Sequence, residues 1–202
     1  MTFELKESEK RIDYTFRNKE LLITAFTHST YANVHGGEDN ERLEFLGDSV
    51  LQMVVSEALY FRKEKDRVLR EGEMTVLRQM MVRKEALLDA VERLGLKDFL
   101  LIEGGAANVG DKTVSSLFET VTAAIYLDSG YRAAKKFISD NLVFRVERNF
   151  KGELQELLQK RGEHTPQYVL EKEGKDNNPL FVCHATASGV QAEGSGKSKA
   201  AA

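Results

Sequence analysis

Three carboxylates within one apolar helical segment have the spacing best suited to chemistry in this chain. Glu41, Glu44 and Asp48 are separated by three and four residues, and at about 3.6 residues per turn they fall on one face of a helix. Carboxylates stacked in this way repel one another unless a cation or a basic partner lies against them. An all-oxygen cluster suits a hard divalent ion such as Mg²⁺, which also binds phosphate oxygens. The spacing therefore indicates metal-assisted phosphodiester chemistry, with a solvated acidic helix face as the alternative.

A long amphipathic helix is needed to present these carboxylates. The run from Glu41 to about Arg62 has helical periodicity and predicts such a helix. An apolar stripe adjoins the acidic line, so the carboxylates should lie at the edge of a buried surface. The members of this stripe are Leu43, Leu46, Val50 and Met53.

The sequence of residues 41–51, ERLEFLGDSVL, resembles the signature of the ribonuclease III family. Three further segments are similar to that family: residues 26–32 before the signature, residues 70–74 after it, and residues 118–130, which resemble a second catalytic helix. The likeness covers approximately residues 5–148. It predicts an all-helical endonuclease domain over residues 1–148.

This resemblance implies a homodimeric endonuclease that uses Mg²⁺ to cleave double-stranded RNA, leaving 5′-phosphate and 3′-hydroxyl ends, in the processing of rRNA and mRNA precursors. Its members hold the metal with four carboxylates, two from each catalytic helix. By position, Glu44 and Asp48 form the first pair and Glu119 belongs to the second, with Asp48 and Glu119 as catalytic residues. The fourth carboxylate is expected three residues before Glu119, where this chain has Ser116.

Ser116 leaves three interpretations open. A hydroxyl is a weak neutral ligand, and Ser116 could hold the metal through a water molecule in a working site. The site could instead be weakened or lost, which would leave a protein that binds double-stranded RNA without cutting it. The alignment could also be displaced by one residue near the glycine-rich segment 104–110. Asp111 lies about 2.2 turns before Glu119 and is poorly placed to substitute.

Three other residues receive roles from the resemblance. Glu41 and Glu71 are expected as acidic residues that support the site, although a structural salt bridge explains each of them equally well. Phe45 lies between two of the proposed ligands, and the family likeness implies that it enters a cavity on the partner chain of a dimer. The alternative for Phe45 is an ordinary buried phenylalanine.

The proline-free part of the chain, residues 1–165, is dominated by helical periodicity. Gly95 is expected to end one helix, and Asp128-Ser129-Gly130 should form a turn. Besides the signature helix, the pattern predicts helices around residues 21–26 and over residues 74–94, 113–127 and 132–146.

The pattern changes near residue 151. A short helix around residues 154–158 is followed by predicted strands at 167–171, 180–185 and 190–193, and by a helix start at 194–200. This order resembles a double-stranded-RNA-binding domain, expected here over residues 151–202 as a small α-β-β-β-α module whose last helix is missing. The likeness implies RNA contacts from Gln155, Glu156, Asn177, Lys197 and Lys199.

Composition sets broader expectations. The chain has 29 basic and 32 acidic residues, a net charge of −3, which argues against indiscriminate nucleic-acid binding. No run approaches the ~20 apolar residues of a membrane helix, and the first residues do not resemble a secretory signal. Cys183 is the single cysteine and is expected to be a thiol in the core, which favours location of the protein in a reducing cytoplasm. The histidines show no zinc-like spacing.

Overall fold

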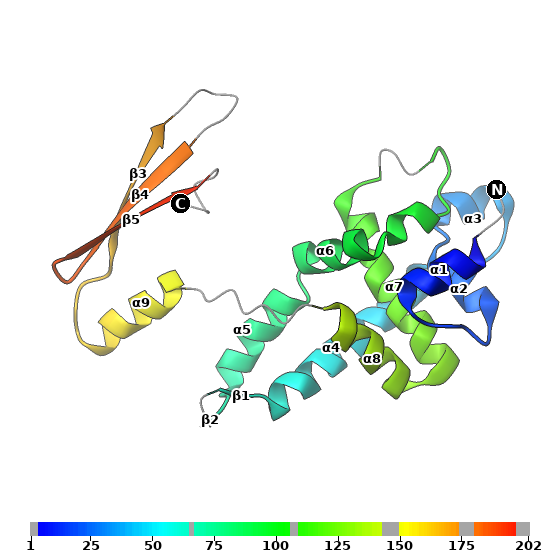
Figure 1. Ribbon diagram of the computed structural model, residues 1–202, viewed down its shortest axis with the longest axis horizontal. Helices are drawn as coiled ribbons and strands as arrows, with labels where there is room; N and C mark the ends of the chain where they lie inside the picture. The colour runs from blue at the N-terminus through cyan, green and yellow to red at the C-terminus, as the bar shows by residue number, and fades with distance from the viewer. Residues whose placement is uncertain (1–3, 65–66, 106–108, 143–149, 174–179, 197–202) are drawn as a thin grey trace. The chain divides into compact units, whose positions relative to one another are not determined.

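The chain forms two compact units, residues 1–146 and 147–202 (Figure 1). The computed structural model describes all residues except 1–3, 65–66, 106–108, 143–149, 174–179 and 197–202.

The first unit is helical apart from one short hairpin. Helix α7 lies at its centre and packs against α2, α4, α6 and α8. The elements are α1 (Leu5–Ile12), α2 (Lys19–Ala25), α3 (Ser29–His35), α4 (Glu41–Phe61), β1 (Lys63–Glu64), β2 (Arg67–Val68), α5 (Glu71–Met81), α6 (Lys84–Leu94), the 3₁₀ helix η1 (Leu96–Phe99), α7 (Asp111–Ser129) and α8 (Tyr131–Asn141).

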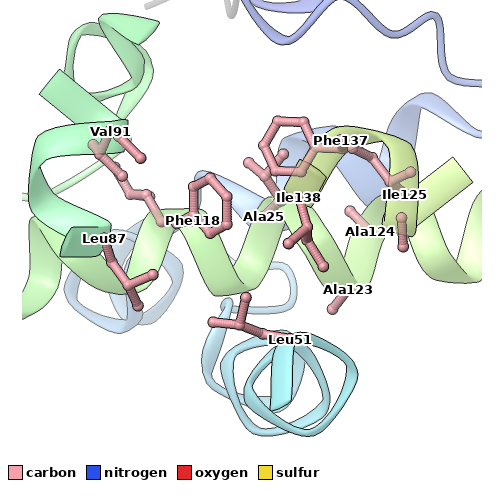
Figure 2. Close-up of a cluster of buried hydrophobic side chains, with 14 of the residues drawn as sticks. Ala25, Leu51, Leu87, Val91, Phe118, Ala123, Ala124, Ile125, Phe137 and Ile138 are labelled. Carbon is pink, nitrogen blue, oxygen red and sulfur yellow. The ribbon is translucent and has the colours of Figure 1, made fainter. Parts of the chain in front are cut away.

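Helix α7 is surrounded because apolar or small residues cover most of its circumference from Val114 to Ile125. Figure 2 shows the result: Phe118 points toward α6, and other α7 side chains meet α4 and α8. The Phe118 ring stacks on Phe137 of α8 with centroids 5.0 Å apart. The neighbours drawn around α7 are Leu51 of α4, Leu87 and Val91 of α6, and Phe137 and Ile138 of α8.

One carbonyl ties three helices together near the start of α4. The buried Asn40 side chain donates to the Ala25 oxygen (3.3 Å), and the Thr120 hydroxyl of α7 donates to the same oxygen (2.8 Å). The Asn40 carbonyl in turn accepts from the Glu44 amide (2.8 Å). Buried polar groups need such partners, and these bonds hold the start of α4 against α2 and α7.

The predicted single helix over residues 74–94 is wrong. The chain leaves helical geometry at Val82 and Arg83, and Arg83 has an extended backbone (φ −65°, ψ 153°). The two halves pack against different helices, α5 on α4 and α6 on α7, so the chain must turn between them. The predicted end at Gly95 is confirmed, because this residue adopts the left-handed conformation (φ 64°) that closes α6.

Two other boundaries differ from expectation. Helix α8 ends at Asn141, and residues 143–146 of the helix predicted over 132–146 lie outside the described residues. The Asn141 side chain there donates to the Phe137 carbonyl (2.9 Å), and the Arg93 guanidinium donates to the Asn141 carbonyl. Helix α7 continues through Asp128 and Ser129, which were expected in a turn, and Gly130 separates it from α8.

The second unit has the predicted helix and three strands. Helix α9 (Phe150–Lys160) precedes β3 (Gln167–Glu173), β4 (Leu180–Ala187) and β5 (Val190–Gly196), which form an antiparallel sheet in the order β3-β4-β5. The predicted helix start is wrong for Gly194–Gly196, because Gly194 pairs with Cys183 and Gly196 with Phe181 in the sheet. The fold class, mainly helical with a small α+β unit, is confirmed.

Among the residues that are described, no helix is both long and apolar enough to cross a membrane.

Candidate active site

Helices α4 and α7 cross closely at Gly47. A Cβ atom added to Gly47 would lie 1.9 Å from the carbonyl oxygen of Glu119 and 2.5 Å from its carbonyl carbon. Any side chain at position 47 would therefore force the helices apart. The missing Cβ brings the backbone of Glu119 against the turn of α4 that carries Glu44 and Asp48.

This crossing places three carboxylates in one electrostatic environment. Burial, followed by the charges of Asp48 and Glu44, raises the pKa of Glu119 to about 7, whereas the charge of Lys112 lowers it. Asp48 is exposed, and one of its oxygens accepts from the Gln52 side chain at 3.3 Å. Glu119 is thus a partly desolvated carboxyl whose ionisation is opposed by two acids and favoured by one lysine.

A hollow of about 150 Å³ opens beside Glu44, whereas Asp48 and Glu119 are not among its lining residues. It lies between the start of α4, the start of α7 and the segment that leads into α3. Its lining residues are His28, Ser29, Asn40, Glu41, Glu44, Lys112, Thr113 and Ser116.

Ser116 lies in this hollow together with Glu44. Its side chain is buried, and the hydroxyl donates to the Thr113 carbonyl of its own helix at 3.1 Å. Asp111 is exposed at the start of α7 and does not line the hollow, which agrees with the expectation that it is poorly placed to replace a ligand.

The donor set fits a hard divalent cation in its chemistry. All the candidate ligand atoms are carboxylate oxygens, which Mg²⁺ prefers. Within the described part of the chain, no three His, Cys, Asp or Glu side chains are gathered closely enough to ligate one ion. Ligation by Glu44, Asp48 and Glu119 therefore requires side-chain rotation, for which the exposed Asp48 has room.

The two supporting acids differ in position. Glu41 is exposed at the first turn of α4 and lines the hollow. Glu71 begins α5, is exposed, and accepts from the Thr75 hydroxyl at 3.1 Å. Glu71 is not among the described residues that line the hollow.

Phe45 lies outside the core. Its side chain is 81% exposed, which excludes an ordinary buried phenylalanine within this chain. Met53, expected in the buried stripe, is 49% exposed, while Leu43 and Val50 are buried as expected. Met53 lies eight residues after Phe45, and Tyr60 seven residues later, so they share one exposed face of α4. We call Phe45, Met53 and Tyr60 the α4 apolar face.

Few of the RNA-contacting residues expected in the second unit have side chains that the structure describes. Gln155 is exposed on α9. The side chain of Glu156 and the whole of Asn177, Lys197 and Lys199 lie outside the described residues.

Sequence reasoning missed three contributors to the site. His28 and Lys112 both line the hollow, and Gly47 creates the helix crossing. A signal existed for two of them: glycine is unfavourable inside a helix and suggests a packing reason, and Lys112 precedes Ser116 by one helical turn. His28 carried no such signal, because the acidic and basic residues that share the hollow with it come from α4 and α7.

Both units of the chain are similar to known proteins. Residues 18–146 match the Ribonuclease-III-like family, and residues 150–202 match the double-stranded RNA binding motif. Ribonuclease 3 of Geobacillus thermodenitrificans is 35% identical over 97% of this chain and 85% of that protein. Ribonuclease 3 of Bdellovibrio bacteriovorus is 38% identical over 96% of this chain and 89% of that protein.

Two crystal structures of the nuclease domain of ribonuclease III from Campylobacter jejuni are also similar. One has a TM-score of 0.63 and 30% identity, covering 73% of this chain and 99% of that domain. The other has a TM-score of 0.60 and 33% identity, covers 68% of this chain and 98% of that domain, and is described as flexible in a region involved in dimer formation. The predictions of family and enzyme class are confirmed: this chain belongs to the ribonuclease III family.

Proposed function

We propose that this chain is a Mg²⁺-dependent endoribonuclease that hydrolyses phosphodiester bonds of double-stranded RNA and leaves 5′-phosphate and 3′-hydroxyl ends. The observation that supports the proposal most is the close α4–α7 crossing at Gly47, which brings the backbone of Glu119 against the turn of α4 that carries Glu44 and Asp48. Residues 1–148 would form the nuclease domain and residues 151–202 the RNA-binding domain.

Glu44, Asp48 and Glu119 would hold the metal, with Asp48 and Glu119 closest to the reaction. When bound, Mg²⁺ lowers the pKa of a coordinated water and neutralises negative charge on the phosphate. Gly47 permits a helix separation that any larger residue would prevent, and this close crossing would keep the backbones that carry the acids near one another. Glu41 would act from the rim of the hollow. Glu71 would act from the start of α5.

RNA recognition is assigned to the second unit. Gln155, Glu156, Asn177, Lys197 and Lys199 would contact the duplex, because the match to the double-stranded RNA binding motif includes all five positions. The proposed substrates are duplex regions of rRNA and mRNA precursors in the cytoplasm.

A second candidate function rests on Ser116. Its hydroxyl is bonded to the Thr113 carbonyl and adds no charge where the family places a carboxylate. A site weakened in this way would leave a double-stranded-RNA-binding protein.

Cleavage of a long RNA duplex separates the two functions. We expect the parent protein to cut the duplex with Mg²⁺, and Asp48→Asn to cut at least about 10³-fold more slowly, while both bind it equally in Ca²⁺. Asp39→Asn, before α4 and outside the hollow, is the control and should cut normally. Binding without cleavage by the parent at any Mg²⁺ concentration would favour the second function.

We also propose that the α4 apolar face forms a homodimer interface. Three large exposed side chains on one helix face are typical of a protein–protein contact, and a related nuclease domain has a region involved in dimer formation.

Phe45→Ala is expected to raise the dimer dissociation constant by about 10- to 100-fold, because truncating a central aromatic residue removes about 1–3 kcal/mol of binding energy. Sedimentation equilibrium measures this change. Val34→Ala, which truncates another exposed apolar residue on α3, should leave association unchanged. An unchanged constant for Phe45→Ala would show that the interface lies elsewhere.

A further inference from the structure

Lys112 stands on α7 where a lysine is electrostatically unfavourable for the helix. It is the second residue of α7, and a cation in the first turn opposes the helix dipole. Its ammonium forms no hydrogen bond or ion pair with any of the residues that the structure describes. A residue that is unfavourable for the helix in which it lies, and that has no structural partner, is a candidate for a functional role.

The position of Lys112 near the acidic residues indicates what this functional role is. It lines the same hollow as Glu44 and Ser116, and its charge lowers the pKa of the Glu119 carboxyl. Lys112, Ser116 and Glu119 are spaced by four and three residues, so they share one face of α7. This face of α7 therefore carries the neutral hydroxyl of Ser116 in the middle and the positive charge of Lys112 one turn earlier.

The net charge of the proposed metal site follows from this arrangement. The carboxylates of Glu44, Asp48 and Glu119 together with one ammonium carry less negative charge than four carboxylates. Such a site attracts a divalent cation less strongly and repels a phosphate less strongly. A flexible lysine can bring its charge to a phosphate oxygen as a point contact.

We propose that Lys112 is a catalytic residue that binds a non-bridging oxygen of the scissile phosphate and supplies positive charge there. In a site with four carboxylates, an additional metal ion would supply this charge. This inference rests on the proposed function. It predicts that Lys112 and Ser116 act together: the lysine is needed because position 116 is neutral.

A double-mutant cycle tests this coupling. In single-turnover cleavage at saturating Mg²⁺, Lys112→Ala should reduce the rate by about 10²-fold, and Lys112→Arg should recover most of the loss. In a Ser116→Asp background the same Lys112→Ala change should cost less than about 5-fold. Lys84→Ala removes an exposed lysine from the first turn of α6 and should leave the rate unchanged in both backgrounds. Equal losses in the two backgrounds, or no loss in the parent, would overturn the proposal.

Calorimetric titration with Ca²⁺ in the absence of RNA gives a readout independent of cleavage. Removing a cation beside the carboxylates should strengthen Ca²⁺ binding by about 3- to 10-fold in Lys112→Ala, with no change in Lys84→Ala. Unchanged binding would place the ammonium away from the acids and contradict the proposal. If the parent does not cleave RNA, the proposed function fails by itself, while the titration still decides whether Lys112 faces the carboxylates.

Discussion

Glu119→Gln is expected to reduce Mg²⁺-dependent cleavage by at least about 10³-fold while making the metal-free protein more stable at neutral pH. Activity is lost because an amide is a poor ligand and cannot supply the negative charge of a carboxylate. Stability rises because Glu119 is desolvated and lies near Asp48 and Glu44, which oppose its ionisation. Active-site residues often carry such a stability cost.

The pH dependence of this gain has a defined sign. The folded-state pKa of Glu119 is about 7, above its ordinary value of 4.5, so folding favours the protonated carboxyl. That contribution to the stability of the parent is complete below pH 4.5 and is lost as the pH rises through 7. In EDTA, Glu119→Gln should therefore exceed the parent by about 1–2 kcal/mol above pH 7, after allowance for solvent screening, and the difference should disappear near pH 4.5.

Urea unfolding in EDTA between pH 4.5 and pH 8 measures this effect. Glu92→Gln, which changes an exposed glutamate on α6, serves as the control and should show no comparable rise with pH. A gain that is independent of pH would mean that charge repulsion at Glu119 is not its cause. Added Mg²⁺ should stabilise the parent more than the variant, since it binds the folded state through the intact carboxylates.

The second large effect is expected at Gly47. Gly47→Ala should lower the free energy of unfolding by about 3 kcal/mol, because its Cβ would lie 1.9 Å from the Glu119 carbonyl oxygen. The atom in the way belongs to the backbone of a central helix, so no side-chain rotation can relieve the clash. Separation of α4 from α7 would also move Glu119 away from Asp48, and cleavage should fall with stability.

Gly72→Ala is the matched control for this substitution. Gly72 also lies in a helix, α5, but a Cβ there would meet no atom within 4 Å. Its stability should stay the same or rise by about 0.5 kcal/mol, because alanine favours helix more than glycine does. Chemical denaturation of both variants measures the difference. Equal behaviour of the two would show that the close crossing at Gly47 is not required.

Much of the helical fold was predictable because its signals are local. The limits of α4 follow from periodicity between residues 41 and 61, and Gly95 ends α6 as its conformational freedom suggests. The break at Val82–Arg83 was not predictable, since the apolar pattern continues through it. It arises because α5 packs on α4 and α6 packs on α7, which is a property of partners far apart in the sequence.

The exposure of Phe45 and Met53 shows the same limit. Periodicity places a residue on a helix face, but only the packed neighbours decide whether that face is covered. Helix α4 packs on α7 and α5, and the face that carries Phe45 and Met53 remains exposed in the single chain.

By itself, the sequence determined the family, the mainly helical fold, and the stacking of Glu44 and Asp48 on one helix face, because helix geometry relates residues three and four positions apart. Only the tertiary structure decided that Glu119 is desolvated beside them and that His28, Lys112 and Ser116 line one hollow. These relations depend on how closely two helices cross, and that distance is set by the missing side chain of Gly47.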